Sequence, residues 1–134
     1  MSFSILYLNQ TNIIVADGDI TRDTSKYFRK FLATSPLDGS IFVVALNSPG
    51  GDLLGGLELG RLIRSENLHT AVLKFRRHPL SGELIRESEE PGSCFSACAL
   101  AFLGGNRREL ISESKLGFHQ FSSAQGSLEK KDRF

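Results

Sequence analysis

Short apolar runs and helical spacings alternate along the chain. Residues 3–8 and 12–16 are two runs rich in β-branched and aromatic side chains, and the polar Asn9-Gln10-Thr11 between them predicts a hairpin or a bent strand. From Thr21 the spacing of apolar residues becomes helical, and 35–39 ends it. The predicted buried face of this helix comprises Tyr27, Phe28, Phe31 and Leu32.

The middle of the chain repeats a strand–helix rhythm. The continuous apolar run at 41–46 is typical of a strand that is buried on both faces, as in a parallel sheet covered by helices. A turn at 47–52 leads into a helix over 53–64, and a third strand follows at 70–75. This alternation predicts an α/β fold with a mostly parallel sheet and right-handed crossovers.

The rhythm breaks in the charged segment 76–92, which has a proline near each end. We expect a solvated surface loop there, with a flap that caps a cleft as the alternative. A helix over 93–103 and a strand over 116–121 follow. The pattern therefore predicts one α/β domain over 1–121, and a polar tail over 122–134 that is disordered or cut short.

Composition narrows the classes of partner and the location. The 134 residues include 16 basic and 15 acidic side chains, so no field draws in nucleic acid, and no apolar run approaches the roughly 18–20 residues of a membrane span. The N-terminus shows no basic residue before its short apolar run and no cleavage site. We expect a cytoplasmic location for the chain as given, and a periplasmic or exported one if its N-terminus was trimmed.

The two cysteines, Cys94 and Cys98, stand four residues apart. No second Cys or His pair stands at a zinc-like spacing, so we expect no metal and no other cofactor. Side chains four apart on a regular helical turn are poorly placed for a disulfide. We therefore favour small packing residues, and a bridge stays open if the segment is not helical.

Candidate chemistry begins with Ser48-Pro49-Gly50-Gly51 and with Ser96. The glycine pair is either a plain strand-to-helix turn or a cluster of bare backbone N–H groups that stabilises an anion. Ser96 lies among small residues near a predicted helix start, where Ser93 can serve as the cap. A serine hydroxyl attacks a carbonyl only when a base takes its proton.

His119 is the candidate base, because it is the only histidine inside an apolar strand. A helix from Ser96 carries the chain roughly 14 Å away at about 1.5 Å per residue, and about five strand residues at roughly 3.3 Å each bring it back. Sites in open α/β sheets gather at the carboxyl ends of strands. Gly50-Gly51, Ser96 and His119 are each predicted at such an end.

Four motifs in order resemble the ClpP/crotonase superfamily, specifically the proteolytic subunit of the Clp protease and its ClpP-like relatives. They are Ala16-Asp17-Gly18-Asp19-Ile20, Asn47-Ser48-Pro49-Gly50-Gly51, Ser96-Ala97 and Gly117-Phe118-His119-Gln120. The resemblance covers about four fifths of the chain. The paired cysteines are similar to those of a ClpP-like branch that is often predicted to be exported.

The resemblance implies repeated β-β-α units and a serine peptidase. Ser96 matches the nucleophile and His119 the general base, while Gly51 and the N–H of Ala97 match the oxyanion donors. Gly50, Gly51 and Gln120 are then expected along the edge where a peptide or unfolded protein substrate adds as a strand. A homo-oligomer is the expected assembly, without an assumed unfoldase partner.

This chain departs from the family pattern at the third catalytic residue, an aspartate well beyond the histidine. Only Glu129 and Asp132 follow His119 as acids, and neither has a recognisable context. An inactive fragment that serves as a peptide-binding or assembly module therefore stays open, as does a crotonase-type acyl-CoA enzyme. A Ser/Lys dyad would use Lys74 or Lys115.

Overall fold

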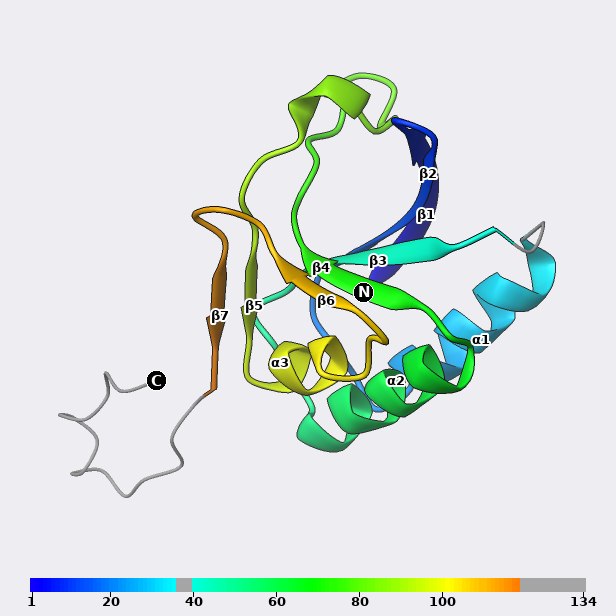
Figure 1. Ribbon diagram of the computed structural model, residues 1–134, viewed down its shortest axis with the longest axis vertical. Coiled ribbons are helices and arrows are strands. Elements are labelled where there is room, and N and C mark those ends of the chain that lie inside the picture. The colour runs from blue at the N-terminus through cyan, green and yellow to red at the C-terminus, as the bar shows by residue number, and fades with distance from the viewer. Residues whose placement is uncertain (36–39, 119–134) are drawn as a thin grey trace, which may run out of the picture.

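The computed structural model describes residues 1–35 and 40–118 (Figure 1). His119, Gln120, the end of the strand expected at 116–121 and the tail at 122–134 lie outside the described residues. So does most of the turn expected at 35–39. The expectations for these residues therefore stay predictions.

The chain begins with a β-hairpin. β1 (Ser2–Leu8) pairs antiparallel with β2 (Thr11–Asp17) in full register, from Leu8 opposite Thr11 to Ser2 opposite Asp17. The two turn residues, Asn9 and Gln10, have φ of 51° and 64°, the positive values that a tight two-residue hairpin turn requires. The sequence left a hairpin and a bent strand open, and the hairpin is confirmed.

The main sheet is mostly parallel. Its order is β1-β2-β3-β4-β6, and β2 runs parallel to β3 (Phe42–Asn47), β3 to β4 (His69–Val72) and β4 to β6 (Arg108–Leu110). β1 is the antiparallel edge strand. The predicted fold class, an α/β fold with a mostly parallel sheet flanked by helices, is confirmed.

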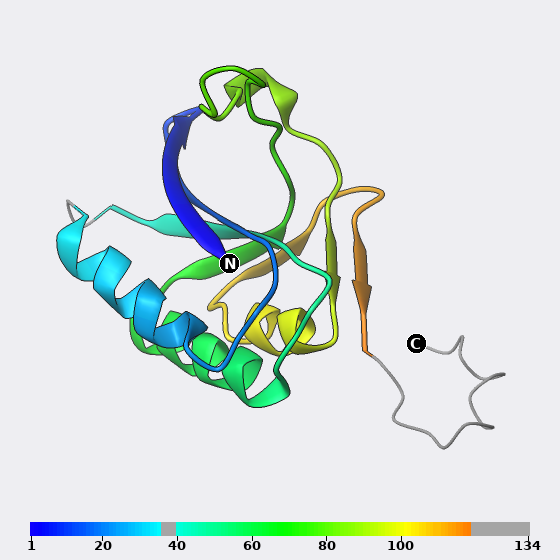
Figure 2. The same ribbon diagram turned by 180° about the vertical axis from the view of Figure 1, so that it is seen from behind.

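The helices gather against one face of this sheet (Figures 1 and 2). They are α1 (Thr24–Thr34), α2 (Leu53–Ser65) and α3 (Ala97–Phe102). Alternate strand residues such as Val44 and Leu46 point into a shared core with Phe28 of α1 and Leu59 of α2. Tyr27 is 55% exposed, so its predicted place on the buried face of α1 is wrong.

The charged segment forms a flap over the opposite face, which we define as residues 74–90. It doubles back on itself through antiparallel bridges from Lys74 to Glu90 and from Arg77 to Leu84, and it contains the short 3-10 helix η1 (Arg86–Ser88). Leu84 packs on a second core cluster of strand residues. The segment is therefore charged and exposed, but it also covers the face of the sheet that the helices leave open.

A small second sheet carries the next part of the chain. β5 (Ser93–Phe95) runs parallel to β7 (Lys115–Gly117), and a bridge from Ser48 to Cys94 joins it to the end of β3. The predicted helix over 93–103 is therefore wrong at its start, because residues 93–95 extend the strand layer and the helix begins only at Ala97.

Candidate active site

Ser96 is the single residue between β5 and α3, and its backbone turns the chain sharply. Its φ is 59° and its ψ is −118°, a conformation that costs a non-glycine residue about 1–3 kcal/mol and persists only where the surrounding structure holds it. Its N–H donates to the Gly117 carbonyl at 2.8 Å. The Ser96 side chain is partly exposed, and its hydroxyl has no hydrogen bond to any residue in the described ranges. The turn therefore presents a free hydroxyl at the surface.

Gly50 lies directly against this serine. A Cβ atom built on Gly50 would lie 2.9 Å from the Ser96 Cβ and 2.7 Å from the Phe95 carbonyl oxygen. The φ of Gly50 is 112°, which L side chains rarely adopt. Only glycine therefore allows the loop after β3 to approach Ser96 this closely.

Ile20, which follows β2, forms backbone hydrogen bonds with the residues on either side of Gly51. The Ile20 N–H donates to the Gly50 carbonyl at 2.8 Å, and the Asp52 N–H donates to the Ile20 carbonyl at 2.9 Å. Among the described residues, the N–H groups of Gly51 and Ala97 have no hydrogen-bond partner. The Ala97 nitrogen lies 3.4 Å from the position of a Cβ on Gly50, so both donors flank the Ser96 turn.

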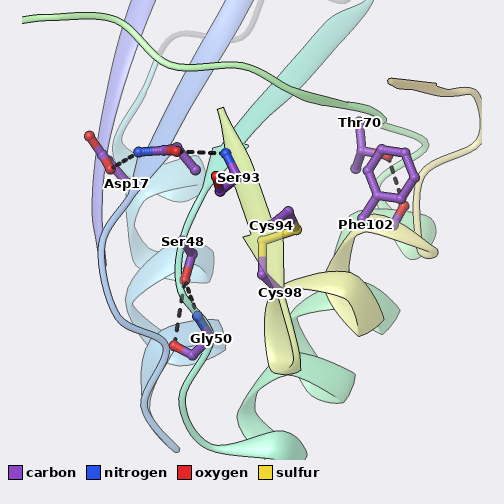
Figure 3. Close-up of a disulfide and its surroundings, with 9 residues drawn as sticks. Asp17, Ser48, Gly50, Thr70, Ser93, Cys94, Cys98 and Phe102 are labelled. Carbon is purple, nitrogen blue, oxygen red and sulfur yellow. Dashed lines mark hydrogen bonds between the residues drawn. A yellow bond between two sulfur atoms is a disulfide. The ribbon is translucent and has the colours of Figure 1, made fainter. Parts of the chain in front are cut away.

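Two polar side chains at the end of β3 fix these segments to one another. The Ser48 Oγ accepts from the Gly50 N–H at 3.0 Å and is buried (Figure 3). The Asn47 Nδ2 donates to Asp17 at 3.0 Å, and its Oδ1 accepts from the Ser93 N–H, also at 3.0 Å. Sequence reasoning gave Asn47 no separate role; its signal is a polar residue directly after an apolar strand.

A disulfide joins Cys94 of β5 to Cys98 of α3 (Figure 3), and Ser96 lies midway between the two cysteines in the sequence. The two Cα atoms are 5.1 Å apart, and both residues are fully buried. The preference for unbridged packing residues is therefore wrong. It assumed a continuous helix, whereas the turn at Ser96 places the two cysteines on different elements.

Electrostatic contacts near the site are modest. Asp52 caps α2, because its Oδ2 accepts from the Gly55 N–H at 2.7 Å, and it pairs with Arg22 at 3.5 Å. Both partners of this ion pair are well exposed, so it contributes little to stability. The described ranges hold no group of three His, Cys, Asp or Glu side chains that is arranged for a metal ion.

The structure brings together four of the predicted site residues: Gly50, Gly51, Ser96 and Ala97. His119 and Gln120 lie outside the described residues. The lysines of the dyad alternative are not bonded to Ser96: Lys74 pairs with Glu90 through its backbone, and Lys115 lies opposite Ser93.

The flap does not reach this turn. In both views it lies at one end of β5, and the start of α3 lies at the other end (Figures 1 and 2). The alternative that residues 76–92 cap a cleft at the serine is therefore not supported.

No helix among the described residues is long and apolar enough to cross a membrane.

Comparison with known proteins gives a structural likeness without a sequence relative. A scan of protein-family models finds no match, and neither does a search of the curated proteins. Six chains of solved structures match, among them a serine-to-alanine mutant of the "1510-N membrane-bound stomatin-specific protease", with a TM-score of 0.53 and 16% sequence identity. The match covers 81% of this chain, which spans 50% of that chain. The likeness shows that this chain has a ClpP-like α/β fold, in common with that protease.

Proposed function

We propose that this protein is a serine hydrolase of the peptidase class, with Ser96 as its nucleophile. One observation carries the proposal: a partly exposed serine with a free hydroxyl sits on a strained turn, between two backbone N–H groups that have no partner in the described residues. Strained residues cluster at functional sites, where the surrounding structure holds them in place. The protease with the same fold supports the peptidase class.

In the proposed reaction, the Ser96 Oγ attacks the carbonyl carbon of a peptide bond. The carbonyl oxygen becomes an oxyanion that accepts hydrogen bonds from the N–H groups of Gly51 and Ala97. His119 takes the hydroxyl proton and passes it to the leaving amine, which breaks the C–N bond and leaves an acyl-enzyme. His119 then takes a proton from a water molecule that attacks the ester carbon, and it returns this proton to the Ser96 Oγ as the ester bond breaks, which frees the acid product and Ser96.

The role of His119 is supported by the position of Gly117. The Gly117 carbonyl accepts from the Ser96 N–H at 2.8 Å, and His119 follows Gly117 by two residues in the sequence. Two residues of chain span at most about 7.6 Å, because consecutive Cα atoms are about 3.8 Å apart. This short separation from a residue that is bonded to Ser96 supports His119 as the proposed base.

We further propose that the substrate is an extended peptide. Gly51 is exposed and has no side chain, so a peptide backbone can approach this segment as an added strand, whereas Gly50 is buried against Ser96. Gln120 stays a further expected contact of the substrate. Such recognition needs accessible main chain more than particular side chains.

Labelling with a fluorophosphonate probe tests the nucleophile. The wild-type protein should be labelled, Ser96→Ala should not, and His119→Ala should react at least tenfold more slowly. Ser93→Ala is the matched control, because Ser93 lies in the same segment and its hydroxyl has no hydrogen bond with a described residue. Folded wild-type protein that is not labelled, or Ser96→Ala labelled as well as the wild type, would refute the proposal.

A further inference from the structure

We infer that the Cys94–Cys98 disulfide positions Ser96 for attack, and that this protein acquires its reactive turn only in a compartment that oxidises thiols. The inference rests on the proposed role of Ser96. It concerns Cys94 and Cys98, which take no part in the proposed reaction, and it adds the requirement that their thiols be oxidised before Ser96 can react.

The bridge spans the one residue whose backbone must be held. Cys94 precedes Ser96 by two residues and belongs to β5, and Cys98 follows it by two residues and belongs to α3. The strained φ of 59° at Ser96 persists only if the two flanking elements keep their relative placement. The disulfide is the covalent link between them other than the chain itself.

The link excludes relaxed conformations of the turn. If residues 94–98 became extended, their end Cα atoms would be about 13 Å apart at 3.3 Å per residue. A disulfide tolerates at most about 7 Å, and the observed separation is 5.1 Å. The bridge therefore keeps α3 folded back against β5, and with it the Ala97 N–H beside Gly50.

The remaining contacts of the turn show why the covalent link matters. On the β5 side, the Ser96 N–H donates to Gly117 and the Phe95 N–H donates to Ser48. On the helix side, α3 is short, ending at Phe102, and Ser96 provides no side-chain cap to its first turn. A short uncapped helix has little stability of its own, so its first residues depend on packing and on the bridge.

Reduction would disturb the turn from within the core. Each sulfur would gain a hydrogen, and the two unbonded thiols would have to move apart to van der Waals contact. Both cysteines are fully buried, so that space must come from neighbouring packed side chains. The displaced atoms would be those that flank Ser96.

Burial also determines when the disulfide can form or be reduced. A reductant cannot reach sulfurs that are fully buried unless the structure opens locally, so exchange in the folded protein is slow. The bridge is therefore set while the chain folds: the two thiols give two electrons and two protons to a disulfide oxidant, which becomes two thiols. Reducing cytosol does not supply this step, whereas secretory and periplasmic compartments do. The cytoplasmic location expected from the N-terminus is then not where the reactive form arises.

The test compares three preparations of the full chain: oxidised wild type, wild type refolded and kept in dithiothreitol, and Cys94→Ala/Cys98→Ala. Dithiothreitol reduces the bridge and becomes a cyclic disulfide, and the mass after thiol alkylation reports the redox state. We expect reduced and double-variant protein to react with the fluorophosphonate roughly 10- to 100-fold more slowly, the loss typical of a misplacement of about 1 Å. Reoxidation with glutathione disulfide should restore the wild type and leave the double variant slow.

A second measurement separates this inference from the proposed function. Amide hydrogen exchange at Ser96 and Ala99, whose N–H groups are bonded in the oxidised turn, should become at least tenfold faster on reduction. Exchange in β3, for example at Val44, should not change. If amide hydrogen exchange of the oxidised and reduced wild type differs as expected but the oxidised protein is never labelled by the fluorophosphonate, only the proposed function is refuted. Unchanged exchange and labelling on reduction would overturn the inference, and so would equal loss of protection in β3, because the bridge would then be a global stabiliser.

Discussion

Substituting Gly56 by alanine should both destabilise the protein and slow the reaction of Ser96. Gly56 lies on α2 where that helix crosses α3, and a Cβ atom there would overlap the Ala97 carbonyl oxygen and lie 2.7 Å from the Ala97 carbonyl carbon. The substitution would also put the new Cβ 2.8 Å from the Cβ of Ala97. Since ordinary contacts of a Cβ begin near 3.4 Å, α3 has to move away from α2 by roughly an ångström.

The expected magnitude is the difference between two opposed effects. Replacing glycine by alanine in a helix interior normally stabilises it by about 1 kcal/mol. Overpacking a close contact costs about 1–3 kcal/mol, and overlap with backbone lies at the upper end or above it. We expect a net loss of about 1–2 kcal/mol. For 134 residues this is a fall in Tm of about 4–7 °C.

Differential scanning calorimetry and the fluorophosphonate labelling rate measure the two effects on the same samples. Because the clash is with Ala97, the residue after Ser96, labelling should also slow by about tenfold or more. Gly82→Ala is the matched control: it has open space around it and a φ of +78°, so it should cost about 1 kcal/mol without slowing the labelling. A Gly56→Ala protein more stable than the wild type would refute the reasoning, because helix propensity alone would then decide the outcome.

Three further outcomes follow from the contacts around the site. Gly50→Ala should abolish detectable labelling in a protein that still folds, because its Cβ would lie 2.9 Å from that of Ser96; labelling at the wild-type rate would contradict the close approach. Asn47→Asp should lower the free energy of unfolding, measured in urea, by more than Asn47→Ala does, because it places a carboxylate where an amide now donates to Asp17; the reverse order would show that this bond is unimportant. Leu84→Ala should lower the Tm by several degrees and leave the labelling rate unchanged, since the flap packs on the second core away from the serine; slowed labelling would show that the flap acts on the site.

The strand and helix pattern was predictable wherever local periodicity and burial agree. The apolar run at 41–46 corresponds to β3, whose Val44, Ala45 and Leu46 are fully buried. The helix expected at 53–64 is α2, which ends one residue later, at Ser65. Tyr27 shows where periodicity fails, because it sits at the margin of the apolar stripe of α1, where a large amphipathic ring remains at the surface.

The sequence predicted which described residues lie together at the candidate site, but it did not predict the backbone conformation around Ser96. The glycines after a strand predicted the loop, and the serine among small residues predicted the candidate nucleophile, which the structure places beside that loop. The periodicity of 93–103 nevertheless favoured a helix, because Ser-Cys-Phe forms a strand only through partners distant in sequence: Ser48 and β7. The same nonlocal pairing puts Cys94 and Cys98 on different elements, so the disulfide was hidden for the same reason.

The hydrogen bond from the Ser96 N–H to the Gly117 carbonyl has a consequence for the order in which the site forms during folding. The parts of the site stand far apart along the chain: Ile20, Gly50, Ser96 and Gly117 come from four separate segments. Contacts between such distant segments form late and slowly, because large loops must close first. On the proposed function, Ser96 is therefore unreactive in a newly synthesised chain until β7 has paired with β5, and a partly folded product cannot be labelled at this serine.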